Sequence, residues 1–265
     1  MGRRPSRRLG KGGIRARGER RGTAKRSSRS STPRRSLEGV LERLVEAVQA
    51  SVSIDVIGLS VNDLREALKP LAKMLLESGD LDKAVKRLTN DPRSLYTSIA
   101  YYLLSQRERL TQEQLDILAS SDPAVLLSQP RKVYREAVRE GRSDIVALLR
   151  EAWNKQYEQK FVLCPRCGFY AVVESMECII CSAKLSSSDL KQALDIEEML
   201  KLFAEEKPAP DIMEAVEEGR ILLCGGSLYA PSKRPRDAVC VEIPLSQRER
   251  QIIREHFKRR TLGQP

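Results

Sequence analysis

Two Cys-x-x-Cys motifs lie ten residues apart in this chain, and they consist of Cys164 with Cys167 and Cys178 with Cys181. Each motif forms a tight turn that points two sulfurs the same way, and two turns complete a tetrahedron at ~2.3 Å from a zinc ion. Because four thiolates leave no open coordination position, we predict one Zn²⁺ with a structural role.

The residues around these cysteines suit a small β-hairpin. Gly168 follows the first motif and supplies the positive φ that such a turn needs, while Ser182 takes the equivalent place after the second motif. Between the motifs, residues 169–173 predict an outgoing strand, and residues 174–175 predict a turn.

Residues 161–185 resemble the zinc-ribbon superfamily through the CPRCG knuckle that begins at Cys164 and the CIIC knuckle that begins at Cys178. Zinc ribbons occur in transcription factors, RNA-polymerase subunits, ribosomal proteins and RNA-processing complexes. The resemblance covers under a tenth of the chain, so it implies a setting in information processing and no particular activity.

Two other uses of the cysteines compete with this prediction. Rubredoxin-like iron sites also use two such motifs, but they separate them further and bury the metal among aromatic residues, which make up only 5% of this chain. A redox-active dithiol is disfavoured because the second pair accompanies the first and no thioredoxin-like βαβ pattern surrounds them.

The remaining cysteines, Cys224 and Cys240, fall on neighbouring predicted strands. Free facing thiols and a disulfide of the kind found in hyperthermophile proteins are alternatives, but we favour buried small apolar side chains. The N-terminus lacks the apolar region of a signal peptide, and no apolar run reaches the ~20 residues that cross a bilayer. We therefore expect a cytoplasmic protein without a membrane partner.

Positive charge is concentrated at the N-terminus. Of the 47 Lys and Arg residues, 14 lie in residues 1–36 beside one acidic residue, whereas the rest of the chain holds 33 basic and 35 acidic side chains. This arm is too poor in apolar residues to form a core, so we predict that it is disordered. Flexible cations bind phosphates through counterion release, although a merely solubilising tail is an alternative. The expected contacts of this arm to RNA or DNA are Arg3, Arg4, Arg7, Arg8, Lys11, Arg15, Arg17, Arg20, Arg21, Lys25, Arg26, Arg29, Arg34 and Arg35.

A second basic group lies between the two predicted C-terminal strands, residues 220–230 and 237–244. Its side chains, Lys233, Arg234 and Arg236, fall in a Pro-rich turn that we expect at the tip of a hairpin. They are candidates for further nucleic-acid contacts, and ordinary surface charge is the alternative.

Outside the cysteine segment, the apolar pattern predicts helices. In residues 37–48 the aliphatic positions recur at i, i+3, i+4 and i+7, as on one helix face. Pro70 interrupts a second such pattern at residues 60–78 and predicts a kink or a break. The predicted fold is mainly α, with a helical domain at 37–160, the ribbon at 161–185, and an α+β segment at 186–265 that contains a β-hairpin and a basic terminal helix.

Three functions fit these features. We favour a non-enzymatic nucleic-acid-binding protein within a larger protein or ribonucleoprotein assembly, with RNA or the ribosome preferred over DNA in transcription or replication. A protein-interaction adaptor is the second. The third is a nuclease that uses scattered carboxylates, but no phosphate-binding glycine motif or His-based catalytic arrangement marks an active site.

Overall fold

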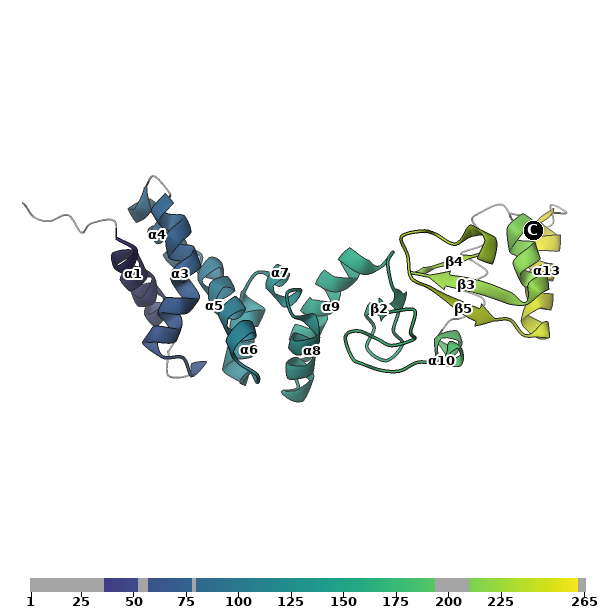
Figure 1. The fold of residues 1–265 in the computed structure, drawn as a ribbon, viewed down its shortest axis with the longest axis horizontal. Helices are drawn as coiled ribbons and strands as arrows, with labels where there is room; N and C mark the ends of the chain where they lie inside the picture. The colour runs from purple at the N-terminus through teal and green to yellow at the C-terminus, as the bar shows by residue number, and fades with distance from the viewer. Residues whose placement is uncertain (1–35, 52–56, 78–79, 194–209, 262–265) are drawn as a thin grey trace, which may run out of the picture. The chain divides into compact units, whose positions relative to one another are not determined.

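The computed structural model describes residues 36–51, 57–77, 80–193 and 210–261 of the chain (Figure 1). The predicted disordered arm lies outside the described residues, apart from Ser36. All described residues belong to one structural unit. They are mainly α-helical, as predicted, with two small antiparallel sheets.

Helices occupy the chain up to the cysteine segment. Each follows the aliphatic periodicity of its sequence and turns that stripe inward. Their bounds are α1 Leu37–Ser51, α3 Val61–Glu77, α4 Leu81–Asn90, α5 Arg93–Gln106, α6 Gln112–Ser120, α7 Pro123–Leu126, α8 Pro130–Arg139 and α9 Ser143–Tyr157.

The stripe predicted in the first helix forms the buried face of α1. Val40, Leu44 and Val48 are almost completely buried, and α1 packs against α3, where Leu64 and Leu68 are fully buried. Burying a side chain of this size contributes about 1.5–3 kcal/mol. This shared aliphatic seam therefore holds the first two helices together.

Pro70 does not break α3, which runs without interruption from Val61 to Glu77. The prediction of a break is therefore wrong. Pro70 is exposed, while Ala67, Leu68 and Leu71 on either side of it stay buried. Because the backbone groups that proline leaves unpaired face solvent, water can satisfy them while the buried stripe continues.

The C-terminal sheet has the strand order β4-β3-β5, with β3 Arg220–Cys224 between β4 Ser227–Tyr229 and β5 Cys240–Pro244. The prediction of a single strand over residues 220–230 is wrong, because the chain turns back at Gly225 and Gly226. Gly225 has a φ of +59°, and a Cβ there would lie 2.8 Å from the carbonyl oxygen of Glu158 at the end of α9. Glycine is therefore required by both the turn and the close approach.

The basic segment after β4 is not a hairpin tip, which corrects the second prediction for this region. It contains the short helix η1 Pro231–Lys233 and runs from β4 to β5, which lie on opposite sides of β3. The helices of this region are α10 Ser187–Gln192, α12 Pro210–Glu218 and α13 Gln247–Thr261. Helix α12 packs on β3 and α13, while α10 packs on β5.

Cys224 and Cys240 form a disulfide, with an S–S distance of 2.09 Å. Both cysteines are buried, as expected for small apolar side chains, but the preference for that role over a disulfide is wrong. The strand register explains the pairing, because it places Cys224 of β3 directly opposite Cys240 of β5 with their Cα atoms 4.1 Å apart.

Candidate metal centre

The first knuckle is a turn closed by its own backbone. The amide of Gly168 donates to the carbonyl of Cys164 at 2.9 Å, and the amide of Cys164 donates to the carbonyl of Phe169 at 2.8 Å. Gly168 has a φ of +76°, as predicted from its place after the motif. The turn thereby brings Cys164 and Cys167 to the same side of the backbone.

The second knuckle repeats this arrangement with different side chains. The amide of Ser182 donates to the carbonyl of Cys178 at 2.8 Å, and the amide of Cys178 donates to the carbonyl of Ala183 at 2.9 Å. Ser182 has a φ of +59°, where a residue with a Cβ is less favourable than glycine. The second turn therefore keeps the knuckle geometry despite a local cost of about 1–2 kcal/mol.

A short β-ladder connects the two knuckles. Strand β1 Val162–Leu163 pairs with β2 Tyr170–Val172 in antiparallel fashion, and Val172 forms a bridge to Cys178. The predicted outgoing strand and the turn after it are thus present, with the amide of Met176 bonded to the carbonyl of Val173. This ladder sets the second knuckle beside the first.

The four sulfurs converge on one point. Those of Cys164 and Cys181 lie 3.8 Å apart, those of Cys167 and Cys178 lie 3.6 Å apart, and all four lie within 4.8 Å of one another. Four sulfurs at ~2.3 Å from a tetrahedral ion would be about 3.8 Å apart. The donor set therefore fits a metal ion of that coordination, which would be held by all four thiolates.

The thiols of the cluster influence one another's ionisation. Three of the cysteines are buried. Hydrogen bonds from the thiols of Cys167 and then Cys178 lower the pKa of Cys164 to about 2. The same contact with Cys164 raises the pKa of Cys178 to about 12 and raises that of Cys167 above its ordinary value. One thiol thus ionises at the expense of its neighbours, and a bound cation is what would let all four ionise together.

Helices α8 and α9 hold the ribbon segment, residues 161–185, in place. The indole Nε1–H of Trp153 donates to the carbonyl of Tyr170 at 2.8 Å. Asn154 donates to the carbonyl of Gly168 and accepts from the amide of Tyr170, both at 3.0 Å. Phe169 is fully buried and packs edge-on against Tyr134 of α8, with ring centroids 5.7 Å apart.

Sequence reasoning missed this clamp. The only signal was the placement of Trp153 and Asn154, two polar-tipped residues, in the last turns of the helix before the first knuckle. Their side chains satisfy backbone groups on either side of Phe169 in the first knuckle and the strand that follows it. The helical part and the ribbon segment are therefore joined by specific hydrogen bonds.

The predicted nucleic-acid contacts from Arg3 to Arg35 lie outside the described residues. In the connection between β4 and β5, Lys233 ends η1, and Arg234 forms an ion pair with Glu174 in the turn of the ribbon segment. Arg236 lines an open pocket with Lys155 and other residues near the end of α9. The three cations thus lie in one connection between β4 and β5, and the charge of Arg234 is paired with that of Glu174.

None of the helices in the described ranges has the length and apolar character required to cross a bilayer. No protein-family model, curated protein or solved structure matches this chain. The function proposed below is therefore inferred from the residues and their geometry.

Proposed function

We propose that this chain is a non-enzymatic nucleic-acid-binding protein of the information-processing machinery, working within a larger protein or ribonucleoprotein assembly. The observation that carries this proposal is the concentration of 14 Lys and Arg side chains in residues 1–36 of a chain that is otherwise nearly neutral. Such a segment neutralises phosphates without reading bases. It contains no aromatic residue, so contacts to the phosphate backbone rather than base stacking are its mode of binding.

We further propose that the four-cysteine site is a zinc ribbon and holds one Zn²⁺. An all-thiolate set favours soft or borderline metals, and zinc is the ordinary occupant of a closed tetrahedral site made of four cysteines. With four thiolates bound, the ion has no position for water or substrate, so its role is structural. Metal analysis of the purified protein should find one zinc per chain, and an iron content in that ratio would overturn the assignment.

RNA is the preferred ligand, because a pliable arm of Arg, Gly and Ser can follow the irregular grooves of folded RNA.

We place the protein in the cytoplasm. The disulfide between Cys224 and Cys240 makes this location testable, because disulfides inside cells are rare outside hyperthermophiles and a cytoplasmic protein would ordinarily keep this pair reduced. Trapping the thiols in intact cells before lysis would show whether this pair is oxidised where the protein works.

The test compares the full chain with a variant that begins at Leu37. Binding to a labelled RNA and to a DNA of the same sequence is measured as salt rises from about 50 to 200 mM. If the arm makes six to ten phosphate contacts, affinity of the full chain falls roughly 10³- to 10⁵-fold over that range, whereas the shortened chain binds weakly with a shallow salt slope.

The control for this comparison is the fold of the shortened chain, which should keep the zinc content and melting temperature of the full chain. Equal affinity and equal salt slope in the two chains would contradict the proposal. A stoichiometric protein that co-purifies after nuclease treatment, with no nucleic-acid affinity, would favour an adaptor. Cleavage of the labelled strand would favour a nuclease.

A further inference from the structure

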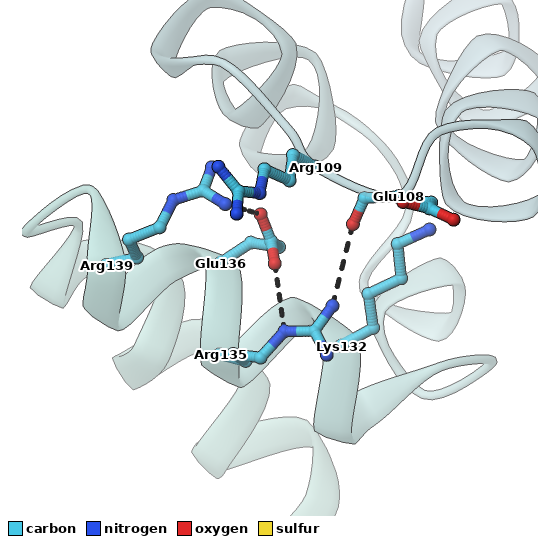
Figure 2. Close-up of a pocket in the computed structure, with 6 residues that line it drawn as sticks. All are labelled: Glu108, Arg109, Lys132, Arg135, Glu136 and Arg139. Atoms are coloured by element: carbon cyan, nitrogen blue, oxygen red, sulfur yellow. Dashed lines mark hydrogen bonds and ion pairs between the residues drawn. The ribbon is translucent and has the colours of Figure 1, made fainter.

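One face of α8 carries four charged side chains at helical spacing, Lys132, Arg135, Glu136 and Arg139. This face lies against the connection between α5 and α6, which contributes Glu108 and Arg109. Together the six residues line an open pocket of about 710 Å³ (Figure 2). The sequence pattern does not indicate this group, because its two halves are more than twenty residues apart in the chain.

The acidic residue at the base of this pocket is already neutralised. Glu136 is 1% exposed, and its carboxylate accepts from Nε of Arg135 at 3.0 Å and from the amide of Leu110 at 3.1 Å, and forms an ion pair with Nη1 of Arg139 at 2.6 Å. Both carboxylate oxygens are therefore engaged, and two cations face one anion. This arrangement leaves no carboxylate free at the base to bind a metal cation.

Two of the basic side chains are tied to the framework. Lys132 donates to the carbonyl of Leu104 at 2.6 Å and also to that of Arg107. Arg139 uses its remaining nitrogens on the carbonyl of Leu110 at 2.8 Å and on Glu140 at 2.9 Å. These bonds attach the connection after α5 to α8 and give the pocket a fixed wall.

Unused hydrogen-bond donors remain above this wall. Arg109 is exposed and makes no hydrogen bond or ion pair with any other described residue, and Nη1 of Arg135 likewise has no hydrogen-bond partner among them. Figure 2 shows the side chains of Arg109 and Arg139 pointing toward one another from opposite sides of the pocket. Since each nitrogen of Arg139 already has a partner, Arg109 is the free guanidinium of this pair, and a free guanidinium suits an oxyanion, which arginine binds through two parallel bonds.

We propose that this pocket binds a phosphate group of the nucleic-acid backbone, with Arg109 as its principal donor. The inference rests on the proposed function and adds to it a binding site on the folded part of the chain. Arg135 also lines a neighbouring groove beside Ile180 and Cys181 of the second knuckle. A strand held by the pocket would therefore continue past the metal centre.

The experiment uses the full chain with Arg109→Ala and, as a matched control, Arg93→Ala. Arg93 is another exposed arginine without a side-chain partner among the described residues, and it lies at the far end of α5, about 20 Å away along the helix. Both variants lose one positive charge and should melt like the parent. Affinity for a labelled RNA and its salt dependence are measured for all three chains.

We expect Arg109→Ala to weaken RNA binding about tenfold and to lower the salt slope by roughly 0.7–0.9, the value of one phosphate contact, with Arg93→Ala unchanged. Equal effects of the two substitutions on RNA binding would overturn the proposal. If the parent binds no RNA, the proposed function fails, and titration with inorganic phosphate becomes decisive. Phosphate binding that Arg109→Ala abolishes would support the site with a free phosphate as ligand, and no phosphate binding would refute it.

Discussion

Removing the metal from the four-cysteine site should unfold the ribbon segment and leave the helices before α9 folded. Trp153 is the only tryptophan in the chain, it is 6% exposed, and its indole donates to the carbonyl of Tyr170 in the ribbon segment. Its fluorescence therefore reports on the contact between α9 and this segment, without interference from any other tryptophan.

The expected effect is large because a zinc ion held by the four cysteines would be the largest single contribution to this small segment. Structural zinc contributes roughly 10–16 kcal/mol in small zinc modules, whereas one fully buried apolar side chain contributes about 1.5–3 kcal/mol. The large apolar side chains that are nearly fully buried in the segment are Val162, Phe169, Val172 and Ile180. These few cannot replace the metal, while the α1–α3 seam does not depend on it.

The assay is tryptophan emission and circular dichroism during titration with a zinc chelator, and again for Cys178→Ser. We expect emission to move to longer wavelength as Trp153 becomes solvated, with little loss of helical signal. The control variant Cys224→Ser/Cys240→Ser, which loses two cysteines outside the cluster, should keep its metal and its emission. Complete removal of metal without any change in emission would refute the reasoning.

Three further predictions test other parts of the fold. The hydroxyl of Tyr102, followed by the amide of Ser60, lowers the pKa of Asp63, so Asp63→Asn should cost about 1–2 kcal/mol at neutral pH, and thermal melts should show this difference shrink as the pH falls below ~4. Gly225→Ala should lower the melting temperature more than Gly141→Ala, since both have positive φ but of the two only Gly225 has an atom within 4 Å of the added Cβ; equal losses would contradict this. Thiol titration of the denatured, metal-free protein should find four free thiols before reduction and six after it. Reducing the β3–β5 disulfide, whose cysteines are 16 residues apart, should lower the free energy of unfolding by about 3 kcal/mol.

The clustering of the four cysteines could be predicted because each knuckle is a local structure. Its closing hydrogen bond joins Cys164 to Gly168, only four residues apart, and the positive φ of Gly168 follows from residue type. The helices were predictable for a similar reason, since the buried positions of α1 repeat within a single turn. The predicted break at Pro70 was wrong because the effect of a proline depends on which side of α3 faces solvent.

The tertiary structure decided the features that join distant residues. Gly225 turns the chain where the end of α9 leaves no room for a side chain. Because of this turn, β4 pairs with one edge of β3 and β5 pairs with the other. The resulting register paired Cys224 with Cys240. Sequence spacing cannot specify such pairings, because each depends on packing between segments that are far apart in the chain.

The two cysteine knuckles and the aliphatic helices thus follow from the sequence alone, because their hydrogen bonds and periodicities span only a few residues. Tertiary packing decided what those elements contact: the Trp153 clamp on the ribbon segment, the disulfide, and the pocket that pairs α8 with Arg109. A charged side chain becomes a buried support, as Glu136 does, or a free donor, as Arg109 does, only when its neighbours have been brought into place.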